Sequence, residues 1–522
     1  MSQIEVEAVA LEIGSTTTLA SAFEGLVGGV RPRFLGQGMA PTTVDEGDVS
    51  IGIEAALADL AAKMSGGSAG SRRGGRRSVS ATIRWGELYA TSSAAGGLRI
   101  SVHGLVHDMT AKAAREAALG AGGIVKMVTA GVLSSSELEA VRRERPNMIL
   151  LAGGVDHGEK ETVLRNAALL ASFLPGAGMS GIPVLFCGNS AAREEVEAIL
   201  RGTGLSVRTV PNVYPRLDEL VVEPAQEAIQ ELFEEHIVNA PGMGALKTLV
   251  RGGVMPTPGA VMTASELWYR SHGDVAVLDV GGATTDVHSV TEGSPELAAF
   301  AVTPEPVAKR TVEGDLGVYR NAVNVAELFL ARLRRDRRPL ALAAEWETAA
   351  GKGPDGPGKV LELLHEFLER PAGSGEILRE TARWLTAMAR PVPATAEERL
   401  VSALLAEEAV RVALERHAGR RRDLLEGAGR HTLVEGKDLT QVKWLVGTGG
   451  ALVRLAAGPR ILAGLRSPRP GGKGGKELLP PESARVLIDR RYVMAAAGLL
   501  SRAYPDAGLA ILEDSLEEVP GV

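Results

Sequence analysis

One stretch constrains the fold more than any other, Val275–Val287, which reads VAVLDVGGATTDV. An apolar run of the β-forming type ends in Asp279, passes through glycines and threonines, and returns through Asp286 to apolar sequence. The pattern predicts a strand, a tight turn and a second strand. Glycine permits close approach of the backbone to an anion, turn N–H groups and threonine hydroxyls donate to phosphate oxygens, and a neighbouring carboxylate suits a hydrated Mg²⁺ ion. An ordinary hairpin with a polar tip is the alternative.

Two further segments share these features. Near the N-terminus an apolar run from Ile4 leads to Glu12, then to glycine and hydroxyl residues at 14–18, and then back to apolar sequence at 19–23. Late in the chain the apolar residues 444–446 lead into the turn Gly447–Gly450, which reads GTGG. Three such segments in one chain are more specific than any one of them.

This order of two acid-tipped hairpins and a glycine turn resembles that of the actin-like ATPases. The resemblance implies an α/β fold of two ribonuclease H-like lobes that clamp ATP, so that hydrolysis would change the angle between them. Glu12 and Asp279 are the expected Mg²⁺ ligands, and Asp286 is expected to orient water or hydrated metal. The expected nucleotide contacts are Gly14, Ser15, Thr16, Thr17, Gly281, Gly282, Ala283, Thr284, Thr285, Gly447, Thr448, Gly449 and Gly450.

Glu223 is a further catalytic candidate, because Glu223-Pro224 resembles a Glu-Pro pair in the heat-shock chaperones whose acid positions the attacking water. The alternative is an acid that caps the N-terminus of a helix.

Composition narrows the class of protein. The chain has 522 residues and a formal net charge of -7, which argues against a general binder of nucleic acid or acidic membranes. A single cysteine, Cys187, excludes an internal disulfide and an all-cysteine metal site within one chain. We see no apolar run of membrane-spanning length and no signal peptide, so we expect a cytoplasmic protein.

The predicted organisation is a first lobe at 1–245 and a second lobe at 246–522. The second lobe is expected to contain a helical insert at about 323–430, the turn at 447–450 and a small-residue helix at 492–500 suited to close helix crossing. Glycine-rich surface loops are expected at 65–77 and 468–476. Within the first lobe, strands alternate with helices, and Gly153, Gly154 and Asp156 follow a buried-type strand. They are either ligand contacts at the carboxyl end of that strand or a plain turn in which the acid caps a helix.

Several segments together resemble the glutamate mutase accessory protein family GlmL, also called MutL and unrelated to the mismatch-repair protein of that name. They are Gly14–Thr18, Ser92–Leu98, Leu151–Asp156, Asp279–Asp286 and Arg310–Gly317. The resemblance covers most of residues 1–325 and resumes at 440–500. It implies a Mg²⁺-dependent ATPase that uses nucleotide-driven motion to release damaged cobalamin from an adenosylcobalamin-dependent mutase, its protein partner. Family members usually carry Asp and Lys where this chain has Glu12 and Leu19.

Other functions stay open. A small-molecule kinase of the same superfamily would use Asp286 or Glu223 near the terminal phosphate, and a nucleotide-binding scaffold would bind ATP without turnover. An activator of a radical dehydratase needs two cysteines per chain, which a single Cys187 argues against. We find no Asp-x-His-x-x-Gly pattern and expect no tightly bound cobalamin. A homo-oligomer is compatible with the sequence, which does not identify the mutase.

Overall fold

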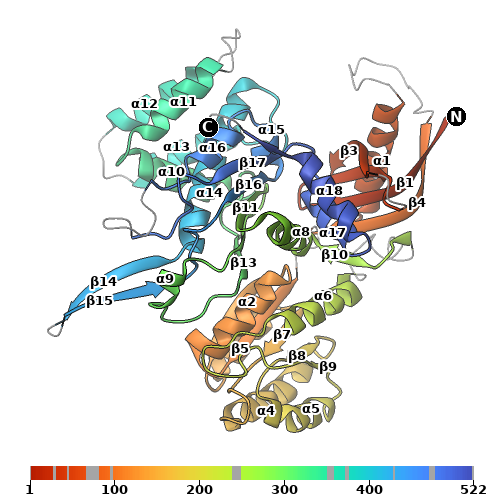
Figure 1. Ribbon diagram of the computed structural model, residues 1–522, viewed down its shortest axis with the longest axis vertical. Coiled ribbons are helices and arrows are strands. Elements are labelled where there is room, and N and C mark those ends of the chain that lie inside the picture. Colours follow the sequence, from red (N-terminus) through yellow and green to blue (C-terminus); the bar gives the residue numbers. More distant parts are fainter. Residues whose placement is uncertain are drawn as a thin grey trace. The chain divides into compact units, whose positions relative to one another are not determined.

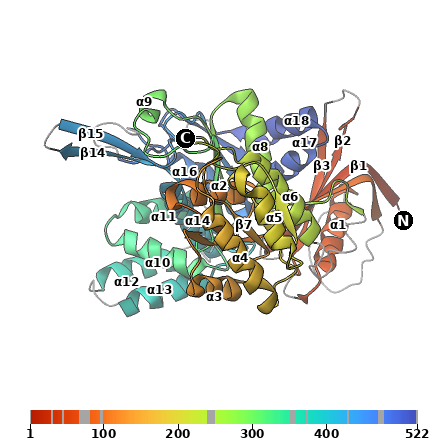
Figure 2. The ribbon, with the colours of Figure 1, turned by 90° about the horizontal axis from the view of Figure 1, so that it is seen from below.

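The computed structural model, drawn as a ribbon in Figures 1 and 2, divides into two compact units by its internal contacts. Unit 1 comprises 1–267, 301–310 and 495–511, and unit 2 comprises 268–300, 311–494 and 512–522. The residues described are 2–27, 31–43, 46–65, 81–93, 98–237, 249–349, 358–370, 375–426, 429–468 and 476–519. The predicted lobe boundary at 245/246, the segment Ala94–Gly97, and all but the end residues 65, 468 and 476 of the loops expected at 65–77 and 468–476 lie outside the described residues.

Unit 1 begins with a five-stranded sheet in the order β10-β4-β1-β2-β3. β1 pairs antiparallel with β2, and β2 with β3, whereas β4 lies parallel to β1 and β10 parallel to β4. The strands are β1 (Ser2–Ile13), β2 (Thr17–Glu24), β3 (Arg33–Pro41), β4 (Ala81–Ser92) and β10 (Val254–Pro256). Helix α1 (Ser50–Met64) packs Ala56 and Leu60 against the face of this sheet that carries Val9 and Leu11. The first predicted hairpin is therefore confirmed as β1–β2.

A second, fully parallel sheet of unit 1 has the order β6-β5-β7-β8-β9. Its strands are β5 (Arg99–Gly104), β6 (Ile124–Ala130), β7 (Met148–Leu151), β8 (Val184–Phe186) and β9 (Val207–Thr209). The helices that connect and follow them are α2 (Lys112–Gly120), α3 (Ser135–Glu144), α4 (Glu161–Gly176), α5 (Arg193–Arg201) and α6 (Glu223–Ile237). In Figure 1, α2 and α6 lie on one side of the sheet and α4 and α5 on the other. We call these elements the parallel module; its strand order is that of flavodoxin-like folds.

A buried histidine joins two strands of the parallel module. His103 on β5 is fully buried, with Ser101 Oγ 2.9 Å from its Nε2 and Thr129 Oγ1 2.8 Å from its Nδ1. Burial lowers the pKa of His103 to about 4, against a smaller opposing effect from Glu137. The neutral imidazole can therefore donate to one hydroxyl and accept from the other.

Unit 2 is built on a six-stranded sheet in the order β13-β12-β11-β16-β17-β18. As in the first sheet of unit 1, the first strand pairs antiparallel with its hairpin partner on one side and parallel with a later strand on the other. The strands are β11 (Val275–Val280), β12 (Thr285–Val290), β13 (Ala308–Glu313), β16 (Trp444–Thr448), β17 (Arg485–Asp489) and β18 (Leu516–Glu518). The second predicted hairpin is confirmed as β11–β12, and the strand order of a ribonuclease H-like unit occurs twice.

The helical insert of unit 2 ends earlier than predicted. Its helices are α10 (Ala322–Leu333), α11 (Arg338–Ala349), α12 (Gly358–Glu369), α13 (Gly375–Ala387) and α14 (Ala396–His417). α14 packs Val410 and Leu414 into the core that includes Leu278 and Val287 of the sheet. Beyond His417 the chain forms the two-stranded hairpin β14 (Arg420–Glu426) and β15 (Gly429–Glu435), visible in Figure 2, where helix was expected to about residue 430.

The small-residue helix expected at 492–500 is α17 (Met494–Ser501), and it does cross another helix closely. A Cβ on Gly498 would lie 1.9 Å from the carbonyl oxygen of Ala260 and 2.9 Å from the nitrogen of Ala264, both on α8 (Thr257–His272). Only glycine permits this approach. Among the described residues, no helix has the length and apolar character needed to cross a membrane.

The stability of the parallel module should depend on pH through His103. Its folded pKa of about 4 lies below the ordinary value of 6.5, so between these values the unfolded chain binds the proton and the folded chain does not. Stability is therefore lost as pH falls from 6.5 towards 4, by about 3 kcal/mol. Urea unfolding of wild type and His103→Gln from pH 7.5 to 4 would show a smaller loss in the variant. His107→Gln, at an exposed position, is the matched control; equal pH dependence in all three proteins would contradict the prediction.

Candidate nucleotide site

Two carboxylates face each other at the tip of the β11–β12 hairpin. Asp279 is the direct cross-strand partner of Asp286, so both side chains project from the same face with Cβ atoms about 5 Å apart. Asp279 is half-buried and Asp286 is buried, with Thr284 Oγ1 donating to Asp286 Oδ2 at 3.1 Å. This geometry arises because the turn 281–284 closes on itself through a 2.9 Å hydrogen bond from Gly281 N–H to the carbonyl of Thr284.

The carbonyl oxygens of this turn are already used by a second segment, Gly314–Asn321, which we call the clasp. The N–H groups of Tyr319 and Arg320 donate to the carbonyl of Gly282 at 2.9 and 2.7 Å, and that of Val318 donates to the carbonyl of Gly281. The side-chain amide of Asn321 donates to the carbonyls of Ala283 and Gly314, each at 2.7 Å.

Unlike the carbonyl oxygens of the turn 281–284, its N–H groups are not used by the clasp. Within the part of the chain that the structure describes, the backbone N–H groups of Gly282, Ala283 and Thr284 have no protein acceptor. A turn whose carbonyls are tied and whose donors are open is a concave anion-binding arrangement. Its chemistry suits phosphate oxygens.

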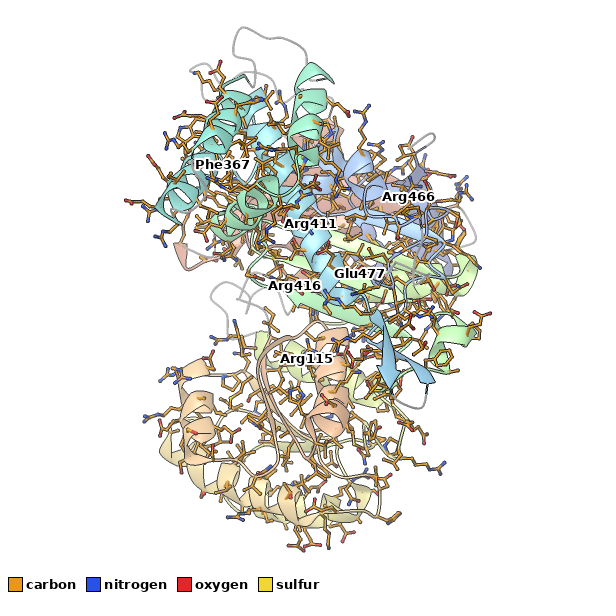
Figure 3. All side chains as sticks on the ribbon, turned by 90° about the vertical axis from the view of Figure 1, so that its left-hand side faces the viewer. Arg115, Phe367, Arg411, Arg416, Arg466 and Glu477 are labelled. Carbon is orange, nitrogen blue, oxygen red and sulfur yellow. The ribbon has the colours of Figure 1, made fainter. Side chains whose placement is uncertain are left out.

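The clasp is held in place by contacts that the sequence did not reveal. A Cβ on Gly317 would lie 2.3 Å from the carbonyl carbon of Ala283, so the clasp touches the turn backbone directly. Arg416, near the end of α14 (Figure 3), pairs with Glu313 and Asp315 at 2.5 and 3.0 Å. The segment Arg310–Gly317 resembled the family in sequence, but the sequence did not predict what the segment does. Its two glycines were the only local feature that could have pointed to a close backbone contact.

The third glycine turn meets the hairpin because β16 pairs parallel with β11 and brings Thr448 beside Asp279. Gly449 has φ +83°, and a Cβ there would lie 2.5 Å from both Asp279 Oδ1 and Val280 N. A Cβ on Gly447 would lie 2.6 Å from Leu462 Cδ1, so that glycine is a packing residue. Around Gly450, which starts α15 (Gly450–Arg454), a Cβ would meet nothing within 4 Å, leaving room for a ligand.

Two of the predicted hydroxyl donors are occupied by the protein. Thr285 is fully buried and donates to the carbonyl of Leu316 at 2.7 Å, while Thr448 donates to Asp489 Oδ2 at 3.0 Å. Asp489 is buried, which raises its pKa, and it also accepts from Ser515 and from the N–H groups of Val493 and Met494. Both hydroxyls are thus used within the protein, by a backbone carbonyl for Thr285 and by a carboxylate for Thr448, and are not directed at a ligand.

In unit 1 the β1–β2 hairpin forms a comparable but less charged tip. Gly14 N–H donates to the carbonyl of Thr17 at 3.0 Å, and the carbonyl of Thr16 accepts from Thr42 N–H at 3.0 Å. Ser15, Thr16 and Thr17 are half-buried at the tip, and Glu12 lies half-buried beside Thr91 of β4. The cross-strand partner of Glu12 is Leu19, which is 2% exposed. The two departures from the family pattern are therefore direct neighbours.

Glu223, the remaining catalytic candidate, is not part of either hairpin. It is the first residue of α6 in the parallel module and is exposed. The structure thus brings Asp279, Asp286, the turn 281–284 and the glycines 449–450 together in unit 2. It places Glu12 with residues 14–17 in unit 1, and Glu223 on a separate element.

The unit 2 site fits a magnesium nucleotide. Among the described residues no cluster of three or more His, Cys, Asp or Glu side chains is arranged to hold a metal. Mg²⁺ in nucleotide sites typically uses one or two carboxylates, several waters and substrate phosphates, so the Asp279–Asp286 pair beside open N–H donors matches its preference.

Two ribonuclease H-like units in one chain, each with an acid-tipped hairpin, define an actin-like ATPase fold. The chain belongs to the MutL protein family, whose family model matches residues 8–352 and 358–516. Protein MutL of Clostridium tetanomorphum is 32% identical over 523 residues, which cover 98% of this chain and 99% of that protein.

Solved structures give weaker likenesses. A nucleotide-free acetone carboxylase matches 95% of this chain and 70% of its own at 14% identity and a TM-score of 0.37. A glycerol dehydratase reactivase matches 96% and 100% at 10% identity and a TM-score of 0.30. The ethanolamine utilization protein EutJ of Carboxydothermus hydrogenoformans matches 97% and 89% at 10% identity and a TM-score of 0.24. At these TM-scores the matches do not bear on function.

The contact between Gly449 and Asp279 predicts an asymmetric response of two adjacent glycines. Gly449→Ala should destabilise the ligand-free protein by at least about 1 kcal/mol, because the backbone is left-handed there and Asp279 and Val280 leave no space for a methyl group. Gly450→Ala, the matched control in open space, should leave stability unchanged. Thermal unfolding would show a lower midpoint for Gly449→Ala alone; equal midpoints for both variants would refute the packing argument.

Proposed function

We propose that the chain binds Mg-ATP at the β11–β12 tip and serves as an ATP-dependent accessory factor. The proposed client is an adenosylcobalamin-dependent mutase such as glutamate mutase, which the factor would reactivate. Membership of the MutL family over nearly the whole chain supports the accessory role. The observation that carries the nucleotide part is the turn 281–284, with tied carbonyls and open N–H groups beside two carboxylates.

Each part of this site has a task in phosphoryl transfer, which depends on positioning and charge neutralisation. Bound Mg²⁺ would neutralise phosphate charge. Asp279 would hold a water of the hydrated ion, Asp286 would orient a second water, and the N–H groups of Gly282 and Ala283 would donate to phosphate oxygens. Gly450 would leave space for the nucleoside.

The unit 1 hairpin favours a second candidate, a scaffold that binds ATP without turning it over. Glu12 is one methylene longer than aspartate, and Leu19 opposite it supplies no charge. The lysine that family members usually carry at position 19 would lie next to the acid and close to the turn. Because this chain has leucine there, the β1–β2 hairpin is expected to bind phosphate more weakly than the β11–β12 hairpin.

ATP hydrolysis with Mg²⁺, measured alone and with a purified cobalamin mutase from the same organism, tests the proposal. We expect turnover that rises with the mutase and falls about 100-fold in Asp279→Ala, because a charge-positioning group is lost. Asp506→Ala, an exposed acid on the first turn of α18 (Pro505–Ser515), is the control and should keep wild-type turnover. ATP binding without turnover would leave the scaffold, and turnover stimulated only by a metabolite would indicate a kinase.

The cross-strand pair Glu12–Leu19 predicts a gain of function. Glu12→Asp with Leu19→Lys should raise ATP turnover roughly tenfold over wild type, because together they restore the acid and the cation of the family pattern next to the turn. The two changes should be coupled, because a buried lysine needs the acid opposite it to stay charged. Leu19→Lys or Glu12→Asp alone should each lower the activation free energy of ATP turnover by less than half as much as the double substitution. A double-mutant cycle on steady-state ATPase rates measures the coupling; additive single effects would count against it.

A further inference from the structure

The carboxyl edge of the parallel module is a second place where this chain could recognise another molecule. In doubly wound sheets, ligands bind outside the carboxyl ends of the strands where the strand order reverses, here between β5 and β7. The loops that leave this edge after β7, β8 and β9 are 152–160, 187–190 and 210–219. We call these three loops the braced edge.

Several backbone donors at this edge are already used within the protein. The N–H groups of Leu105 and Val106, just after β5, both donate to Thr110 Oγ1 at 2.9 and 3.2 Å. After β7, Asp156 N–H donates to the carbonyl of Pro215, and His157 N–H donates to Asn189 Oδ1. These four N–H groups are therefore not open to an anionic ligand.

Three side chains lock the loops of the braced edge to one another. Asp156 Oδ1 accepts from Ser190 N–H at 2.8 Å and from Asn212 Nδ2 at 3.0 Å, which joins all three loops. Burial acts to raise the pKa of Asp156, but these hydrogen bonds outweigh it and lower the pKa below its ordinary value. Asn189 Nδ2 donates to the carbonyls of Gly158 and Glu159. The edge is thus rigid before any partner arrives.

Rigidity is combined here with backbone strain and an exposed apolar side chain. Leu217 is 70% exposed. The next residue, Asp218, has φ +61° and is held by a hydrogen bond from its N–H to Tyr214 Oη at 3.0 Å. His157, on the loop joined to this one through Pro215, also has φ +61°. Non-glycine residues in this conformation cost free energy and concentrate at functional sites.

Charge on and beside the braced edge is predominantly acidic, although Arg193 also contacts the loop after β9 through the carbonyl of Val210. Lys160 pairs with Glu195 at 2.6 Å and Arg216 lies 3.8 Å from Glu219, which offsets those two acids. Glu159, Glu194 and Asp218 are exposed, and the described residues include no ion-pair partner for any of the three. Such a rim attracts a basic surface and repels an acidic one.

We infer that the braced edge is a docking surface for a protein whose apolar pocket receives Leu217 and whose rim of lysines and arginines faces Glu159, Glu194 and Asp218. A protein is favoured over a nucleotide because the unpaired charge is negative, the exposed anchor is apolar, and four of the backbone donors are already used. Preorganised loops bind without the cost of ordering them, which suits such an anchor. This inference rests on the proposed function, and the partner it assigns to the surface is the cobalamin mutase.

Equilibrium binding of the full chain to the purified mutase, followed by biolayer interferometry, tests the surface. Leu217→Asp should weaken binding at least tenfold, whereas Leu249→Asp, the same change at a residue that is 62% exposed, should not. Asp218→Asn keeps a residue that tolerates a positive φ and removes the charge, so it should weaken binding two- to fivefold and reduce its salt dependence. Basal ATP turnover should be unchanged in all three variants.

The outcomes separate the surface from the proposed function. If wild type binds the mutase and Leu217→Asp binds equally well, the docking surface is wrong and the accessory role stands. If wild type does not bind the mutase and its ATP turnover does not respond to the mutase, both the docking surface and the proposed accessory function are wrong. If Leu217→Asp changes the sedimentation of the chain by itself, the edge is a self-association surface instead. Binding that is insensitive to salt would contradict the inference that the partner presents lysines and arginines to this surface.

Discussion

The candidate nucleotide site in unit 2 depends on one backbone contact that leaves no space for a side chain. Parallel pairing of β16 with β11 carries the turn after β16 into the carboxylate of Asp279, where Gly449 leaves space and adopts a positive φ. The neighbouring clasp then ties the carbonyls of the β11–β12 turn. With the carbonyls fixed, the turn can present only its N–H groups, so a phosphate cradle follows from backbone packing and needs no basic residue.

The same strand order built twice does not make two equivalent tips. In unit 2 an acid faces an acid across the hairpin, which suits a hydrated cation between protein and phosphate. In unit 1 an acid faces a buried leucine, so this hairpin pairs one carboxylate with an apolar side chain where unit 2 pairs two carboxylates. Under the proposed function, nucleotide binding would depend mainly on residues of unit 2, and the changes at Glu12 and Leu19 would affect the rate of turnover most.

Sequence reasoning succeeded where the signal is local. Strand, glycine turn and returning strand are specified by adjacent residues, and the small side chains of α17 predicted its close approach to α8. It failed where distant segments decide. Nothing near Thr285 or Thr448 shows that Leu316 and Asp489 take their hydroxyls. The arginines and leucines of 420–426 favour helix, yet pairing with β15 makes them a strand.

In the parallel module, part of the sheet edge that binds ligands in doubly wound folds makes hydrogen bonds within the protein. Its strand order would place a phosphate at the β5–β7 end, but Thr110 takes the two N–H groups after β5, and the adjoining loops bind one another instead. On the loop after β9, Asp218 donates its N–H to Tyr214 Oη and adopts a positive φ, and the preceding residue, Leu217, is exposed. In the docking surface inferred for this edge, burial of Leu217 by a partner would remove its apolar area from water, and loops already joined by hydrogen bonds would need little further ordering.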